Sequence, residues 1–171
     1  NINVSSSNSY YKSVNGVLFD KDGQVLIRYP QAKTATSYTV PTSVTTIADS
    51  SFLFCFNLND VTIPDGVTNI DQYAFWNCKN LQTITIPASV RSIGYGAFGG
   101  CTGLTSITIP NSITSIGDAA FNGCSGLTSI TSLIPADKLF VPGNFAFLIV
   151  DKMPLHFFLV LLLAFYYHQL I

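Results

Sequence analysis

The sequence predicts a β-rich solenoid, built from stacked repeats that each add one strand to a parallel sheet. The first observation is a strict period of 23 residues, which all four cysteines share. The second is that prolines and apolar residues keep the same step in several columns. A unit of this length is too small to bury its own apolar face and buries it against its neighbours. The columns are Pro41, Pro64, Pro87 and Pro110; Ile47, Ile70, Ile93 and Ile116; Phe52, Phe75, Phe98 and Phe121; Cys55, Cys78, Cys101 and Cys124; and Leu58, Leu81, Leu104 and Leu127.

The period defines four repeats, and each one ends in the predicted strand. They cover residues 41–63, 64–86, 87–109 and 110–132. In the third repeat, Ile107 and Ile109 alternate with Ser106 and Thr108, which is the pattern of a strand with one buried face. Pro110 then ends the strand. The Ala-Phe pair before each later cysteine is expected in a short turn or 3₁₀ segment that presses the phenylalanine into the core.

The repeats are similar to the BspA-like leucine-rich repeats, a family of bacterial and protist surface proteins whose unit has the same length. The resemblance covers about residues 38–132, and the first copy departs from it at Ser51 and Phe54. It implies a leucine-rich-repeat solenoid with a hairpin-like insert, because members of the family often carry such an insert between blocks of repeats. The residues that carry it in the third repeat are Ser89–Gly94, Ala97, Phe98, Cys101 and Leu104–Pro110.

Residues 1–40 are predicted to be irregular apart from one N-terminal β-hairpin. Two apolar runs flank Asp20-Lys21-Asp22-Gly23, a sequence typical of a turn. The same residues resemble the start of a calcium-binding loop, but Gln31 stands where such a loop requires glutamate, so turn chemistry is favoured. Ile2-Asn3-Val4 has the rhythm of the later strands and is interpreted as the last strand of an upstream repeat.

Residues 133–171 are predicted to hold a degenerate fifth repeat and an apolar tail. Gly143–Phe147 repeats the pattern of Gly117–Phe121, but 26 residues later. The run Phe157–Tyr167 is apolar throughout and is shorter than the roughly 20 residues that cross a bilayer. Three interpretations of the tail remain open: a buried cap or packed helix, a short membrane anchor, and an artefact of truncation. Membrane contact is expected only through residues 155–171.

The cysteines are interpreted as a column of buried structural thiols. Equivalent positions in a solenoid stack at about 4.8 Å with parallel side chains. A disulfide instead needs Cβ atoms about 3.8 Å apart and turned toward each other. Four ligands in a row cannot surround a tetrahedral zinc ion. Disulfides and metal binding are the less favoured alternatives, and no metal site is predicted.

Composition and motifs argue against catalysis and against nucleic-acid binding. Charged residues make up 10% of the chain, and a net charge of −1 offers no basic patch for phosphates. The two histidines, His156 and His168, lie in the apolar tail away from any cysteine or carboxylate cluster. The sequence holds no nucleophile elbow and no phosphate-binding glycine pattern. We therefore expect no enzyme activity and no cofactor.

The candidate binding surface is a two-lane ribbon of mostly hydroxyl side chains, called the ribbon below, at the outward positions of successive strands. Threonine is a good strand former, and cross-strand threonine pairs add a few tenths of a kcal/mol, which is the structural explanation. The functional explanation is that the concave sheet of a solenoid docks a protein or glycan. Ice binding is a third alternative, against which the irregular Asp60 counts. The lanes are Thr39, Thr62, Thr85, Thr108 and Thr131, and Ser37, Asp60, Thr83, Ser106 and Ser129.

The resemblance to BspA-like proteins implies a cell-surface or secreted protein that mediates adhesion, with an extracellular protein or glycan as its partner. A surface rich in uncharged Ser, Thr and Asn is also common in secreted β-rich proteins. The alternative is a structural spacer with no ligand of its own. On the adhesion hypothesis, the partner-binding residues are Asp60, Thr62, Thr83, Thr85, Ser106, Thr108, Ser129 and Thr131.

Overall fold

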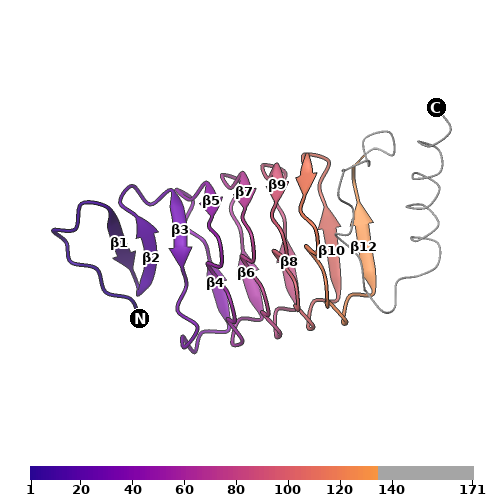
Figure 1. Cartoon of the computed structure of the whole chain (residues 1–171), viewed down its shortest axis with the longest axis horizontal. Coiled ribbons are helices and arrows are strands. Elements are labelled where there is room, and N and C mark those ends of the chain that lie inside the picture. Colours follow the sequence, from indigo (N-terminus) through magenta and orange to yellow (C-terminus); the bar gives the residue numbers. More distant parts are fainter. Residues whose placement is uncertain (135–171) are drawn as a thin grey trace.

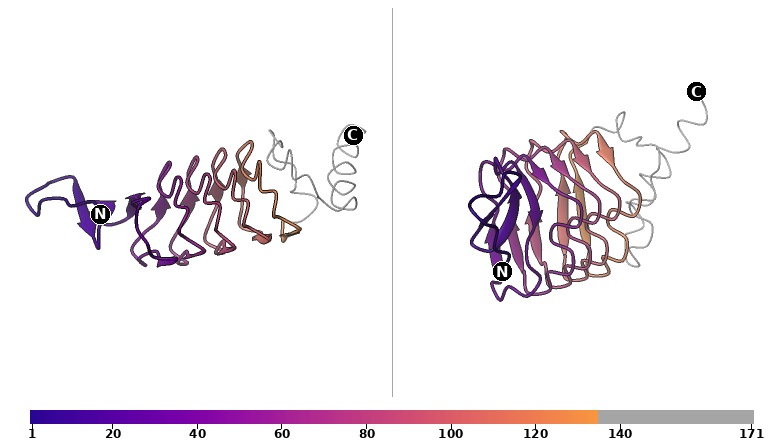
Figure 2. Two further views of the ribbon diagram at one scale, coloured as in Figure 1. Left: turned by 90° about the horizontal axis from the view of Figure 1, so that it is seen from below. Right: turned by 60° about the vertical axis from the view of Figure 1, so that its left-hand side comes forward.

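The chain forms a coil of stacked turns that carries β-strands on two of its sides (Figure 1). The structure is a computed structural model, and it describes residues 1–134. Successive turns follow one another along a single axis, so repeats that are adjacent in sequence lie side by side (Figure 2). None of the described residues is helical. The predicted β-solenoid is therefore confirmed for this part of the chain.

One strand of each repeat lies in the parallel ladder that the sequence predicts. The strands are β4 (Ser37–Thr39), β6 (Asp60–Thr62), β8 (Thr83–Thr85), β10 (Ser106–Ile109) and β12 (Ser129–Ser132). Equivalent residues of neighbouring repeats pair, as in Thr62 opposite Thr85. Hydrogen bonds join β4, β6 and β8 into one sheet and β10 and β12 into another, so the ladder is interrupted between β8 and β10. The inward residues Ile84 and Ile107 are buried, as the alternation predicts.

A second parallel ladder runs along another side of the coil. Its strands are β5 (Thr46–Ile47), β7 (Asn69–Ile70), β9 (Ser92–Ile93) and β11 (Ser115–Ile116). Each repeat therefore holds two short strands where the sequence predicts one. A strand of two residues contains a single inward position and no alternation, so the hydrophobic period cannot reveal it.

The predicted hairpin is present and forms the first rungs of the second ladder. β2 (Val17–Asp20) and β3 (Val25–Arg28) pair antiparallel, and β3 then pairs in parallel with β5. An additional strand, β1 (Tyr11–Val14), pairs with β2. The turn between β1 and β2 is Asn15-Gly16, whose φ angles of 50° and 77° suit a two-residue hairpin turn. The ladder thus begins before the first predicted repeat.

The N-terminal residues differ from their interpretation as a strand. Residues 2–4 contain no strand. They run along the outer edge of β1, where Ile2 N donates to Gly16 O at 2.9 Å and Val4 N donates to Ser13 Oγ at 3.0 Å. These contacts partly cover an edge strand whose backbone groups would otherwise be open to pairing.

The segment that follows each strand of the second ladder forms separate turns and no 3₁₀ helix. In the third repeat, Ala97 N donates to Gly94 O within the repeat, whereas Phe98 N donates at 2.8 Å to Ala120 O of the next repeat. The first two repeats show the same alternation of local and inter-repeat hydrogen bonds. Because every second N–H is used by the neighbouring repeat, a run of consecutive 3₁₀ hydrogen bonds cannot form.

The core is a stack of equivalent side chains, one from each repeat. The phenylalanine rings from Phe52 to Phe121 are buried, with neighbouring centroids 4.8, 5.3 and 5.4 Å apart and ring planes within 8° of parallel. Tyr29 continues this column at its N-terminal end, with its ring 5.4 Å from that of Phe52. The cysteine, leucine and isoleucine columns are buried in the same way. The predicted core columns are therefore confirmed.

Ser51 is an exception in the core, because it occupies the position that alanine holds in the later repeats. Its hydroxyl is buried and has no hydrogen-bond partner. A buried hydroxyl without a partner costs about 1 to 3 kcal/mol. We therefore expect Ser51→Ala to raise the free energy of unfolding by about 1 kcal/mol in chemical denaturation. The reverse change, Ala97→Ser, is the matched control and should destabilise the protein. A Ser51→Ala protein less stable than wild type would contradict this interpretation.

The predicted fifth repeat and apolar tail lie outside the described residues from position 135 onward. Within residues 1–134, no helix is long and apolar enough to span a membrane. The three interpretations of the tail therefore remain predictions.

Candidate binding surface

The structure places the ribbon residues on one side of the coil, as the sequence predicts. In both lanes all side chains are exposed except Asp60, which is half-buried. Residues of β6 lie directly opposite their counterparts in β8, and residues of β10 opposite those in β12. The sheet that carries the ribbon is interrupted only between β8 and β10. The ribbon is therefore a row of short polar side chains held in fixed register by the strands beneath it.

The hydroxyl groups of the ribbon differ in their hydrogen bonds from those of several exposed threonines in other columns. Away from the ribbon, Thr45, Thr68 and Thr114 each donate to a carbonyl oxygen of the preceding turn of the coil, at 3.3, 3.3 and 3.0 Å. Within the described residues, the only side-chain hydrogen bond inside the ribbon joins Thr83 Oγ1 to Asp60 Oδ1, at 3.0 Å. The threonine lane thus keeps its donors and acceptors free for solvent or a ligand.

The ribbon is almost uncharged. Asp60 is its single ionisable residue, so long-range attraction of a charged partner cannot contribute much to binding. No group of three or more Cys, His, Asp or Glu residues that could hold a metal ion occurs among residues 1–134. Recognition at the ribbon would therefore rest on hydrogen bonds and on close contact with short side chains.

The four cysteines are free and buried, and they form the column that the sequence predicts. Cys78 Sγ donates to Phe52 O at 3.1 Å, and the next two cysteines make the equivalent bonds at 3.1 and 3.0 Å. Burial raises the pKa of Cys55 and of Cys124 to about 12 and raises the pKa of Cys78 and Cys101 as well. Such thiols supply almost no thiolate at neutral pH. The geometry thus assigns these cysteines a structural role.

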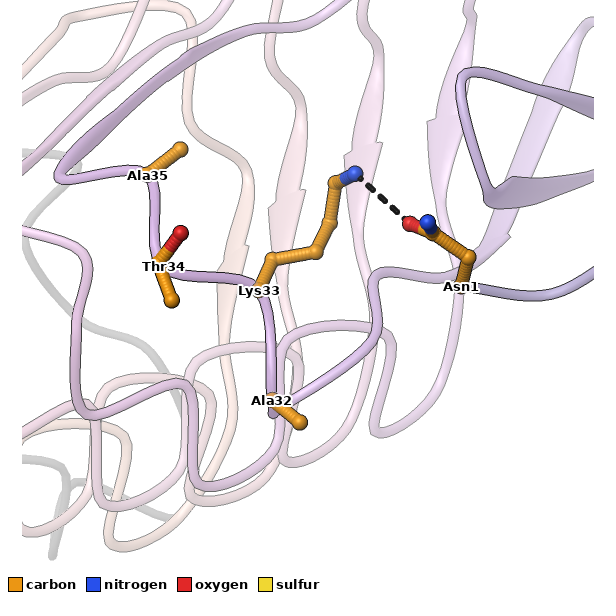
Figure 3. Close-up of a pocket in the computed structure, with 5 residues that line it drawn as sticks. All are labelled: Asn1, Ala32, Lys33, Thr34 and Ala35. Atoms are coloured by element: carbon orange, nitrogen blue, oxygen red, sulfur yellow. Dashed lines mark hydrogen bonds between the residues drawn. The ribbon is translucent and has the colours of Figure 1, made fainter.

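A pocket lies at the N-terminal end of the molecule (Figure 3). It is lined by Asn1, Ala32, Lys33, Thr34 and Ala35. The Lys33 ammonium group donates to Asn1 Oδ1 at 3.1 Å and to the backbone oxygen of Asn15 at 2.8 Å. The ammonium group of Lys33 is therefore already engaged, and the other side chains of the lining are not ionisable.

A group of aromatic side chains on the turns is a surface feature that sequence reasoning does not find. The ring of Tyr73 meets the rings of Trp76 and Tyr95 edge-on, each with centroids 5.3 Å apart. Tyr95 is 44% exposed, and the other two residues are half-buried. None of the three aromatic residues recurs at the repeat period. No column marks them, and only the chain's single tryptophan, close to Tyr73 in the sequence, hints at the site.

Comparison with solved structures gives bacterial leucine-rich repeat proteins. This chain is similar to a leucine-rich repeat protein from Eubacterium ventriosum (33% identity, TM-score 0.66) and to the pneumococcal vaccine antigen PcpA (32%, 0.72). It is also similar to a leucine rich cell surface protein from Faecalibacterium prausnitzii (27%, 0.62). The similarities cover 76%, 76% and 77% of this chain but 41%, 32% and 41% of those proteins. The chain thus spans less than half the length of each. Among curated proteins no similar sequence was found.

Comparison with protein families agrees with the architecture. The model of the BspA type leucine rich repeat region matches residues 29–147, in six copies. The match begins at Tyr29, the residue that opens the stack of aromatic rings in the core. It covers more than half of the chain. The chain therefore belongs to the BspA-type leucine-rich repeat proteins.

Proposed function

We propose that the chain is part of an extracellular adhesion protein and that the ribbon is the surface on which it docks a protein partner. The observation that carries the proposal is the difference between the two kinds of exposed threonine. Five exposed threonines in other columns, Thr45, Thr68, Thr102, Thr114 and Thr128, donate to a backbone oxygen of the preceding turn, as Thr68 Oγ1 does to Thr45 O at 3.3 Å. Those of the threonine lane make no such bond within the described residues. Hydroxyls used only to stabilise the coil would be expected to find partners within it.

The location of the protein is inferred from its relatives. One similar solved structure is described as a leucine rich cell surface protein and another as a pneumococcal vaccine antigen. Both descriptions support a surface or secreted location for this chain. A partner at the ribbon would meet short side chains in register, which allow close approach and provide hydrogen bonds at the density of ordinary protein interfaces.

Charges in the middle of the ribbon are expected to abolish docking. Thr85 lies on β8, the central strand of the ribbon, and Thr108 lies on the next strand, β10; both side chains are exposed. Changing both to lysine would leave two ammonium groups to be desolvated under a bound partner. We expect binding to immobilised extracellular matrix proteins to weaken by about tenfold or more, which corresponds to about 1.4 kcal/mol. Surface plasmon resonance with the whole chain would measure this loss of binding.

The matched control is Thr68→Lys with Thr114→Lys, which adds the same charges in a column that already contains Arg91. This control should bind as wild type does, and circular dichroism should show both variants folded. If wild type binds a matrix protein and the Thr85→Lys, Thr108→Lys variant binds it equally well, the ribbon is not the docking surface. If wild type binds none of the immobilised matrix proteins, the hypothesis of a structural spacer replaces the adhesion hypothesis.

A further inference from the structure

Trp76 is anchored on two glycines of the following repeat. A Cβ atom placed on Gly96 would lie 3.0 Å from Cε3 and Cζ3 of the indole, and one on Gly99 would overlap the same two atoms. The benzo edge of the ring therefore fills the space that the absent side chains leave. Nε1 belongs to the opposite edge, and within the described residues it makes no hydrogen bond. The indole is thus fixed on one edge and keeps its N–H donor free on the other.

Tyr95 lies between two polar residues of its own column. Backbone hydrogen bonds set the register on both sides: Tyr73 N donates to Tyr95 O at 2.9 Å, and Gly96 N donates to Asp118 O at 3.0 Å. Tyr95 therefore lies between Gln72 in the preceding repeat and Asp118 in the following one, and both are exposed. Neither side chain is hydrogen-bonded within residues 1–134. An accessible tyrosine thus has an exposed glutamine at the same position of the preceding repeat and an exposed aspartate at that of the following one.

This combination matches the chemistry of a sugar. The C–H groups of a pyranose pack against an aromatic ring, which is a large apolar surface with a negative face. Sugar hydroxyls act as both donors and acceptors, so they suit an amide, a carboxylate and the polar tips of tyrosine and tryptophan. Asp118 makes an anionic ligand unfavourable. We propose that Tyr73, Trp76 and Tyr95 form a second binding site, on the turns and away from the ribbon, and that its ligand is a neutral oligosaccharide.

A protein partner fits this group of rings less well. Tyrosine and tryptophan are also common at the centre of protein interfaces, but charged residues such as aspartate are depleted there, and here the exposed Asp118 stands next to Tyr95 in the column. Phe54 and Phe56 are the purely apolar rings of the preceding turn, with centroids 5.9 Å apart. Within the described residues, no ring contact joins that pair to Trp76. The three amphipathic rings therefore form a separate site.

The test uses the protein's own fluorescence, because Trp76 is the only tryptophan in the chain. Cellohexaose, maltohexaose and chitohexaose would each be titrated while tryptophan emission is recorded. We expect at least one of them to change the emission with a dissociation constant of about 1 mM or below. Tyr95→Ala and Gln72→Ala should each weaken that binding by about tenfold. Tyr10→Ala, which removes a 76% exposed tyrosine from the segment before β1, is the matched control and should bind as wild type does.

The outcomes separate this site from the ribbon. The Thr85→Lys, Thr108→Lys variant should keep the sugar response in full, so either proposal can fail without the other. An emission unchanged by all three sugars up to about 10 mM overturns the inference. So does equal sugar binding by Tyr95→Ala and Tyr10→Ala. A change in emission caused by a matrix protein but by none of the sugars would assign the rings to a protein partner and would also overturn it.

Discussion

Replacing Phe98 by alanine is expected to lower the free energy of unfolding by about 3 to 5 kcal/mol. The ring is buried between Phe75 and Phe121, with centroids 5.3 and 5.4 Å away. Its removal leaves a cavity that cannot close easily, because backbone hydrogen bonds hold the repeats at a fixed separation. Phe75 N donates to Ala97 O at 2.7 Å on one side, and Phe98 N donates to Ala120 O at 2.8 Å on the other. The lost packing energy should therefore be felt almost in full.

Urea denaturation followed by circular dichroism would measure the loss. Phe56→Ala is the matched control, since Phe56 is 45% exposed, and it should change stability by about 0.5 kcal/mol or less. Stacked repeats sometimes unfold in parts, so the transition should also be followed by the emission of Trp76, and the two curves should coincide. A loss below about 1 kcal/mol for Phe98→Ala would show that the ring stack is not the main support of the core.

The repeat period predicts the core so well because each column marks a side chain that faces the next repeat. A column survives only if every copy can stack on its neighbours, so the side-chain identity itself records the contact. The ribbon is predictable for a similar reason, because Ile84 and Ile107 alternate with outward threonines on strands long enough to show it. The period does not show which exposed hydroxyls are hydrogen-bonded within the coil. The lack of such bonds in the threonine lane, which supports the ribbon as a site, is visible only in the structure.

Backbone conformation is harder to predict from the columns. Ser50, Tyr73, Gly96 and Ala119 share one position in the repeat, and their φ angles are 56°, 54°, 58° and 56°. Only one of them is glycine, the residue that adopts this left-handed conformation without strain. Stacking on the neighbouring turns imposes the conformation on the other three, at a cost that their own sequence does not reveal. The aromatic site escaped prediction for a related reason, since Tyr73 owes its position to this turn.

Alkaline pH is expected to destabilise the protein steeply, because the buried cysteine thiols can ionise only after the protein unfolds. The ordinary pKa of the thiol is 9.0, and burial raises it to about 12 for Cys55 and Cys124. Desolvation also raises the pKa of Cys78 and Cys101. Below about pH 8 both states keep nearly all their thiol protons, and stability does not depend on these groups. Above pH 9 the unfolded chain releases protons that the folded protein retains, so stability falls as pH rises toward 12.

Each such thiol contributes a slope that approaches about 1.4 kcal/mol per pH unit above pH 9, and the four together should remove about 4 kcal/mol between pH 9 and pH 10. Urea denaturation at several pH values from about 8 to 10 would measure this loss of stability. The range ends at pH 10 because Tyr29 and Tyr38, whose pKa values are also raised from 10.0, affect the pH dependence of stability mainly above that pH. The double variant Cys78→Ala, Cys101→Ala should be less stable than wild type at every pH, because it leaves cavities. Its loss of stability per pH unit should be half that of wild type. The same dependence in this variant and in wild type would show that the thiols are not its source. Rapid labelling of native wild type by a thiol reagent near pH 7 would also contradict the burial on which the prediction rests.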